Sequence, residues 1–177
     1  SLAKLSEEDP TFRFSENPDT GQTIISGMGE LHLEIVLGRL ERDYHVGVNA
    51  GRPQVVYRET VSREASAQGV FDREIAGARH YAMVEVHLIP QPRSAGNAIV
   101  HRISDGSIPE LFLPAIEEGI RDGLNGGPLM GYPVVDVETV VLRGSCHESF
   151  STDLAFRVAA SMAFKQAFEQ ATPLLLE

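Results

Sequence analysis

Residues 20–61 read TGQTIISGMGELHLEIVLGRLERDYHVGVNAGRPQVVYRETV, and this stretch decides the fold of the first part of the chain. At its centre, residues 30–44 repeat apolar side chains at helical spacing, with charged side chains largely off that stripe, which predicts an amphipathic helix. Glycines just before this helix permit a tight turn from strand to helix. An anion site at the helix N-terminus is the alternative, but Glu30 already complements the helix dipole. The apolar stripe consists of Leu33, Val36, Leu37, Leu40 and Tyr44.

On the N-terminal side of this helix the sequence predicts a β-hairpin. Residues 11–15 and 22–26 are rich in β-branched and aromatic side chains, and the NPDTG segment between them supplies turn chemistry. Residues 2–8 are expected to form the end of a helix, because Pro10 disfavours helical geometry at the residue before it, Asp9. After the central helix, an extended segment starts at Val46 and residues 54–61 have a strand-like composition. We place a domain boundary near Pro53.

The second part of the chain also mixes strands and helices, which predicts the α+β class for both parts. Residues 81–89 alternate in hydrophobicity, with Val84, Val86 and Leu88 on one face, as expected of a strand. Residues 174–176 have the composition of a strand's first residues, and we expect its partner sheet to lie outside this chain. The other predicted elements are a helix over 114–124, a strand over 134–142, a polar loop over 143–151 and a helix over 153–170 with Thr152 as N-cap.

Composition narrows the classes of function. The net charge of −10 argues against nonspecific nucleic-acid binding over the whole surface, so any RNA contact should be local. The single cysteine, Cys146, excludes an internal disulfide, and no second Cys or regular His spacing offers a zinc site. No apolar run approaches the roughly 18 residues of a membrane span, and we expect a cytoplasmic protein without a membrane partner. No GxxxxGK[ST] sequence is present, so we expect no GTP site, cofactor or GTPase activity in these residues.

Several stretches resemble elongation factor G. They are residues 5–14 (LSEEDPTFRF), residues 20–61, residues 126–142 (GGPLMGYPVVDVETVVL) and residues 153–167 (DLAFRVAASMAFKQA) with PLLLE after them. The resemblance covers essentially the whole chain and is weakest over residues 62–107. It implies a partial ferredoxin-like third domain over residues 1–52, lacking its first strand. It further implies a fourth domain of the ribosomal protein S5 domain 2-like type over residues 53–177, ending at the start of the fifth domain.

The resemblance also implies a function. In the family the fourth domain is an arm that reaches the decoding region of the small ribosomal subunit and holds transfer RNA and messenger RNA during translocation. The third domain relays the nucleotide state of the GTPase domain. This implies that the parent protein is a GTP-hydrolysing elongation factor that binds GTP and Mg²⁺ outside these residues, and that the GTPase and C-terminal domains are partners within the same chain.

Two segments match the RNA-contacting tip of that arm. The first is residues 76–83 (AGARHYAM), where the family usually has GGRGQYGH; Gly77 and Tyr81 match, but several glycines are alanine, which narrows the allowed backbone conformations. The second is residues 143–149, in which His147 aligns with the tip histidine and could bond a 2′-hydroxyl or phosphate or stack on a base. With Arg73, the first segment supplies a small cationic cluster suited to phosphate contact. The implied RNA-contacting residues are Arg73, Gly77, Arg79, His80, Tyr81, Gly144, Ser145, His147 and Glu148.

Two alternatives remain open at the level of sequence. The altered first segment would suit a paralogue that acts in ribosome recycling or in tetracycline ribosomal protection. The acidic composition would suit a protein-interaction domain without a ribosomal role.

Overall fold

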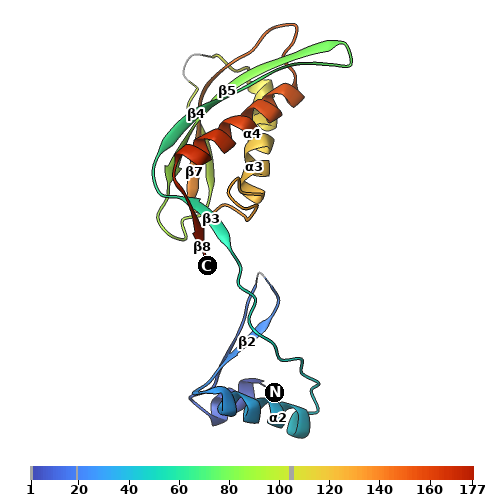
Figure 1. The fold of residues 1–177 in the computed structure, drawn as a ribbon, viewed down its shortest axis with the longest axis vertical. Helices are drawn as coiled ribbons and strands as arrows, with labels where there is room; N and C mark the ends of the chain where they lie inside the picture. Colours follow the sequence, from blue (N-terminus) through green and yellow to red (C-terminus); the bar gives the residue numbers. More distant parts are fainter. Residues whose placement is uncertain (1, 19, 104–105) are drawn as a thin grey trace. The chain divides into compact units, whose positions relative to one another are not determined.

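The computed structural model describes residues 2–18, 20–103 and 106–177, which divide into two compact units. The first extends to Val56 and the second is Tyr57–Glu177. Both units mix helices and strands, so the predicted α+β class is confirmed (Figure 1). Within the described ranges, no helix is long and apolar enough to cross a membrane.

The first unit packs two helices on a β-hairpin. Strands β1 and β2 pair antiparallel, with Phe14 opposite Ile25, as the turn sequence between them predicted. Helix α2 (Glu30–Tyr44) begins and ends where the apolar stripe predicted. The C-cap residue His45 has a left-handed backbone and donates its N–H to the Leu40 carbonyl. The elements are α1 (Leu2–Glu8), β1 (Arg13–Glu16), β2 (Thr23–Ser26) and α2 (Glu30–Tyr44). The core consists of Leu5, Phe12, Val36 and Leu40.

Residues 45–57 contain no regular secondary structure, although the sequence predicted a strand from residue 54. The strand β3 (Arg58–Val61) begins four positions later than predicted. Val46 and Val55 are exposed, so this segment gains little from burial of its apolar side chains.

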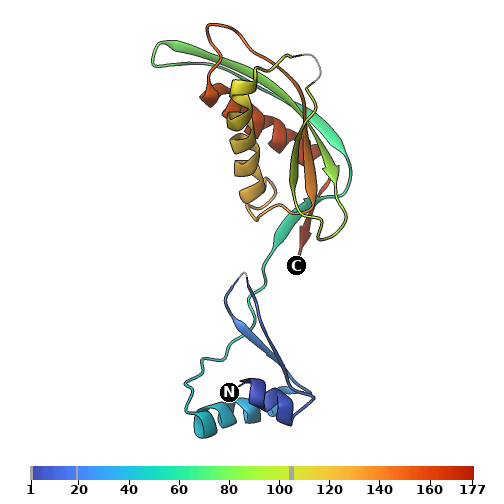
Figure 2. The ribbon, with the colours of Figure 1, turned by 180° about the vertical axis from the view of Figure 1, so that it is seen from behind.

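The second unit is a sheet covered on one face by two helices (Figure 1). The strand order is β4-β5-β7-β6, in which β6 runs parallel to β7 and the other pairs are antiparallel. Figure 2, from behind, shows the long β4–β5 hairpin extending along the sheet to one end of this unit. The elements are β4 (Ala65–Ile75), β5 (Ala78–Pro90), β6 (Ala98–His101), a 3₁₀ turn η1 (Glu110–Phe112), α3 (Leu113–Asn125), β7 (Val137–Ser145) and α4 (Asp153–Gln170).

The alternation predicted for residues 81–89 is confirmed, because Val84, Val86 and Leu88 are fully buried against the helices. Helix α4 is apolar on more than one side, and its alanines and phenylalanines fill the space between the sheet and helix α3. The Thr152 hydroxyl accepts a hydrogen bond from the Ala155 amide, so the predicted N-cap is also confirmed.

The prediction for the last strand is wrong. Strand β8 (Pro173–Leu176) does not lack a partner: it pairs antiparallel with β3, with Val61 opposite Pro173 and Arg58 opposite Leu176. Composition identified this segment as a strand, but its partner lies more than a hundred positions earlier and no local pattern could show it. Strand β7 is also displaced from the predicted range, ending at Ser145 rather than at residue 142.

The loop over residues 126–134 folds around a buried carboxylate. Glu59 on β3 is fully buried, and its oxygens accept backbone hydrogen bonds from Leu129 (2.9 Å), Met130 (2.7 Å) and Tyr132 (3.0 Å). A Cβ atom on Gly127 would overlap one Glu59 oxygen, so only glycine fits there. Glu59, which had no predicted role, thus ties β3 to this loop.

Candidate functional site

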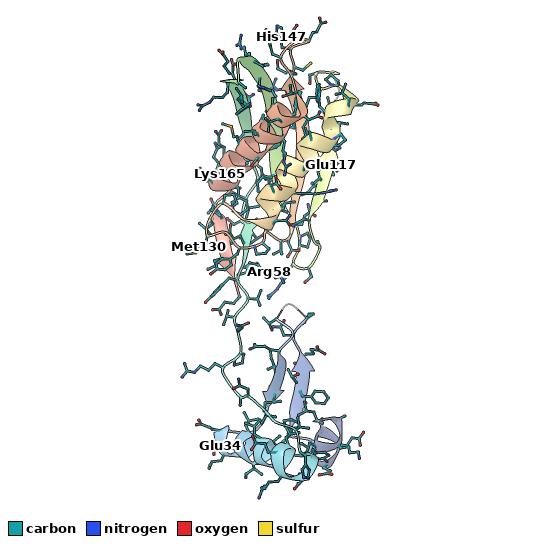
Figure 3. All side chains as sticks on the ribbon, turned by 90° about the vertical axis from the view of Figure 1, so that its right-hand side faces the viewer. Glu34, Arg58, Glu117, Met130, His147 and Lys165 are labelled. Atoms are coloured by element: carbon teal, nitrogen blue, oxygen red, sulfur yellow. The ribbon has the colours of Figure 1, made fainter. Side chains whose placement is uncertain are left out.

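All nine predicted contact residues lie in the second unit, on the β4–β5 hairpin, at the end of β7 and in the loop that follows. Figure 3 shows His147 at one end of this unit and Arg58 at the other. Of the first tip segment, only Ala76 and Gly77 form a turn, and residues 78–83 belong to β5 rather than to a loop. We call residues 146–151 the tip loop, because Gly144 and Ser145 belong to β7.

The hairpin turn requires a left-handed backbone at both connecting residues. Ala76 has φ 51° and Gly77 has φ 82°, as in the two-residue turns that match the twist of paired strands. The alanine at position 76 therefore holds a conformation in which its Cβ atom carries a steric cost. The alanine thus adds strain to this turn, and the pairing of β4 with β5 is still complete up to Ile75 and Ala78.

Tyr81 joins the hairpin to the tip loop. Its amide donates to the Phe150 carbonyl at 2.8 Å, and its carbonyl accepts from the Ser151 hydroxyl at 2.7 Å. Its phenol oxygen lies 3.4 Å from the Ser145 hydroxyl. Residues far apart in sequence are thereby held together at one end of the unit.

The tip loop holds His147 through its backbone and through its ring. The His147 amide donates to the Ser151 hydroxyl at 2.8 Å, and its Nδ1 accepts from the Ser149 amide at 3.2 Å. The imidazole stacks on the Phe150 ring, with centroids 4.5 Å apart and planes inclined by 28°. Because Nδ1 accepts a hydrogen bond, the proton of the neutral ring lies on Nε2.

The three predicted cations have different environments. Arg79 makes a bidentate ion pair with Asp72 at 2.7 and 2.9 Å, and its guanidinium lies 5.6 Å from the centre of the Phe150 ring. The Arg79 hydrogen bonds lower the pKa of Asp72, and the same bonds raise the pKa of Arg79. His80 contacts the Thr152 hydroxyl at 2.9 Å, whereas exposed Arg73 lies opposite His80 and has no ion pair within the described part of the chain.

Of the remaining predicted residues, Gly144 has a packing role and Glu148 is exposed at the surface. A Cβ atom on Gly144 would stand 2.6 Å from the Ile108 side chain and 2.6 Å from the Met83 carbonyl oxygen, so the glycine permits close packing. Glu148 is exposed in the tip loop and adds negative charge there. A loop that contacted only phosphates would not be expected to place a carboxylate at this position.

Three residues of this site were not predicted from sequence: Asp72, Phe150 and Ser151. Phe150 is an aromatic side chain in an otherwise polar loop, and this contrast in the sequence could have indicated a role for it. Asp72 and Ser151 act through partners on other elements, which local sequence does not reveal.

The face of the sheet that the helices do not cover carries a second group of polar side chains. Ser66, His87 and Glu64 have the composition of a hydrolase triad, with Ser66 Oγ 2.7 Å from His87 Nδ1 and Glu64 3.1 Å from Nε2. The Glu64 side chain is 61% exposed, so the histidine is not held in the desolvated setting that activates a nucleophile. Across residues 2–18, 20–103 and 106–177, no group of three or more His, Cys, Asp and Glu side chains could hold a metal ion.

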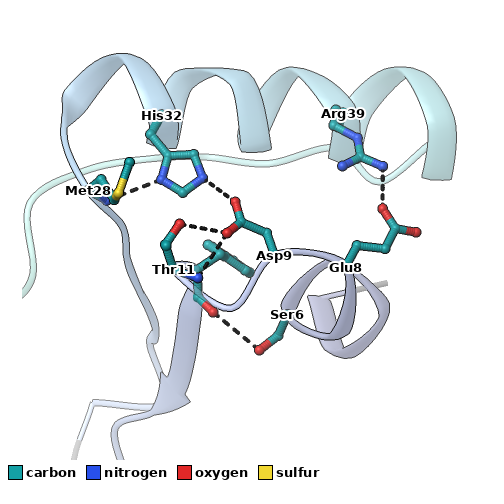
Figure 4. A network of polar contacts seen from close by, with 8 residues as sticks. Ser6, Glu8, Asp9, Thr11, Met28, His32 and Arg39 are labelled. Atoms are coloured by element: carbon teal, nitrogen blue, oxygen red, sulfur yellow. Dashed lines mark hydrogen bonds and ion pairs between the residues drawn. The ribbon is translucent and has the colours of Figure 1, made fainter.

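The first unit contains a polar network around His32, near the start of α2 (Figure 4). His32 Nε2 lies 2.8 Å from Asp9, and its Nδ1 accepts from the Met28 amide at 3.1 Å. A Cβ atom on Gly27 would stand 2.8 Å from His32 Nδ1, so this glycine is explained by close packing as well as by the turn. Hydrogen bonds from Thr11, followed by the His32 contact, lower the pKa of Asp9.

Comparison with known proteins agrees with the two-unit organisation. Family models match residues 1–52 as "Elongation Factor G, domain III" and residues 53–172 as "Elongation factor G, domain IV". Both matched models describe domains of one class of translation elongation factor. The chain belongs to the elongation factor G family.

The similar proteins support this assignment along the full chain. This chain is 50% identical to elongation factor G of Thermotoga petrophila and 49% identical to that of Thermotoga maritima. In both cases the match covers 100% of this chain and 26% of the relative. A crystal structure of a protein from Thermus thermophilus has a TM-score of 0.68 and 41% identity, covering 99% of this chain and 26% of that one. The chain thus spans 26% of the length of these curated relatives.

Proposed function

We propose that this chain forms the RNA-facing arm of a translational GTPase that promotes movement of transfer RNA and messenger RNA through the ribosome. Residues 1–52 would be the third domain and residues 53–177 the fourth, with β8 completing the two-stranded sheet with β3. The arm would enter the decoding region of the small subunit with the tip loop and the β4–β5 turn leading.

One observation carries this proposal: Tyr81 brings the two tip segments together at the end of the second unit. Exposed Arg73 supplies a cation for phosphate, and the exposed imidazole of His147 supplies a hydrogen-bonding ring. Arg79 has a different role, because its charge is paired with that of Asp72. We assign Arg79 to holding the hairpin and the Phe150 ring rather than to phosphate binding.

The parent protein would bind and hydrolyse GTP with Mg²⁺ at a site outside these residues. Its partners would be the ribosome, transfer RNA, messenger RNA and the other domains of the same polypeptide. It would act in the cytoplasm, where translation takes place.

The test uses the full-length factor with His147→Ala, in single-turnover translocation on ribosomes and, separately, in ribosome-stimulated GTP hydrolysis. We expect translocation to slow by about tenfold and GTP hydrolysis to change by less than about twofold, because the lost contact belongs to the RNA-bound state. Lys165→Ala, an exposed change on α4 away from the tip, is the matched control (Figure 3). An unchanged translocation rate in His147→Ala would contradict the proposal.

A further inference from the structure

One side chain, Ser151, holds the backbone of the tip loop to the hairpin. Its hydroxyl accepts from the His147 amide at 2.8 Å and donates to the Tyr81 carbonyl at 2.7 Å. A hydroxyl has one proton and two lone pairs, so it makes both bonds at the same time. The Phe150 and Ser151 amides donate to the His147 carbonyl at 3.2 and 3.0 Å, which closes the loop into a tight turn.

The imidazole of His147 is fixed separately from its backbone. The Ser149 amide occupies Nδ1, and stacking on Phe150 sets the plane of the ring. Within the part of the chain that the structure describes, no hydrogen bond is made by Nε2, and the residue is exposed. The ring therefore presents an N–H donor to whatever approaches the tip.

We propose that Ser151 is the positioning residue for His147, and that His147 meets RNA as a neutral Nε2–H donor to an oxygen acceptor. This inference rests on the proposed function of the tip and specifies its chemistry. The acceptor is a phosphate or 2′-hydroxyl oxygen, since both accept a hydrogen bond from a neutral ring. Ser151 acts through His147 and makes no contact with RNA itself.

Removal of the Ser151 hydroxyl should loosen the loop without unfolding the unit. The His147 amide and the Tyr81 carbonyl lose a shared partner, but His147 is exposed and Tyr81 only half-buried, so water can take the place of the hydroxyl. The Tyr81 amide keeps its bond to the Phe150 carbonyl, so the loop stays attached to β5.

The first experiment measures hydrogen exchange by mass spectrometry on the full-length factor free of ribosomes. In Ser151→Ala we expect peptides covering residues 145–151 to exchange about fivefold to tenfold faster, the size typical of one lost hydrogen bond. Peptides from the middle of β5 should not change. Ser149→Ala is the matched control, because Ser149 contributes its backbone amide to the contacts described. Unchanged exchange in Ser151→Ala would overturn the positioning role, whatever the tip does on the ribosome.

The second experiment measures single-turnover translocation. Ser151→Ala should slow translocation about threefold to tenfold at unchanged GTP hydrolysis, Ser151→Thr should restore it because the hydroxyl returns, and Ser149→Ala should leave it unaffected. If His147→Ala is slow but Ser151→Ala is fast despite a loosened loop, positioning by Ser151 is overturned while the proposed function stands. If both are fast, the proposed function of the tip fails, and with it the donation to RNA.

The third experiment distinguishes donation by Nε2 from attraction by charge. His147→Gln places an N–H donor near the position of Nε2, whereas His147→Asn places one near Nδ1. We expect Gln to retain most of the translocation rate and Asn to lose about as much as Ala. A His147→Lys variant that matched wild type better than Gln would overturn the neutral-donor account.

Discussion

Gly69 of β4 lies so close to Ala159 of α4 that a Cβ atom on Gly69 would overlap the Ala159 carbonyl oxygen. It would also stand 2.5 Å from the Ala163 amide nitrogen, so both contacts are with the helix backbone. No side-chain rotation relieves such contacts, and the helix itself would have to move away from the sheet. Gly69 therefore sets the distance between α4 and β4.

We expect Gly69→Ala to lower the free energy of unfolding of the second unit by about 3 kcal/mol, because overpacking against a backbone has no inexpensive relaxation. Urea titration of the chain, followed by circular dichroism, measures the change. Gly126→Ala is the control, since a Cβ atom there meets its nearest neighbour, the Asp122 carbonyl oxygen, at 3.9 Å. Equal stability of the two variants would show that the helix is not held at this distance.

The buried carboxylate of Glu59 gives a second prediction. Glu59→Gln replaces one accepting oxygen with an NH₂ group that faces backbone N–H donors, so we expect a loss of about 2 to 4 kcal/mol of unfolding free energy. Exposed Glu169→Gln makes the same chemical change on α4 and should have little effect. The prediction fails if the Glu59 and Glu169 variants unfold at the same urea concentration.

The N-cap of α4 gives a third prediction. Thr152→Ala removes the acceptor for the Ala155 amide and the partner of His80, and we expect it to cost about 1 kcal/mol, typical of a lost cap. Thr152→Ser keeps the hydroxyl and should retain most of the stability. Thermal unfolding of both variants provides the comparison, and a Ser variant as unstable as the Ala variant would contradict the capping role.

Acid should weaken the second unit through Glu85. Hydrogen bonds from Arg143, and then from Gln68, lower the pKa of this carboxyl below its ordinary value of 4.5. A lowered pKa in the folded state means that the contribution is complete above about pH 4.5 and is lost as the pH falls through the folded value. Stability measured between about pH 6 and pH 3 should therefore fall more steeply in wild type than in Arg143→Met. Arg73→Met removes the same charge from a residue without a described ion pair, and it should keep the wild-type slope.

Local sequence determined most of the elements. Apolar spacing in residues 30–44 predicted both ends of α2, alternation identified β5, and the hydroxyl of Thr152 marked the start of α4. These signals are local because a helix or strand face repeats over a few residues, and because a cap bonds within one turn. The sequence resemblance also assigned His147 and Tyr81 to one predicted tip.

Tertiary structure decided what surrounds those residues. Pairing of β8 with β3, the backbone cage around Glu59, and the neutralisation of Arg79 by Asp72 each depend on a partner that no local pattern identifies. The same holds for Ser151, whose hydroxyl has a role only because β5 brings the Tyr81 carbonyl beside it. The sequence by itself thus determined most of the elements and the family. Only the fold decided which residues of the predicted tip keep a free hydrogen-bond donor and which residues position them. The reason is that the fold brings groups that are distant in sequence within 3 Å of one another.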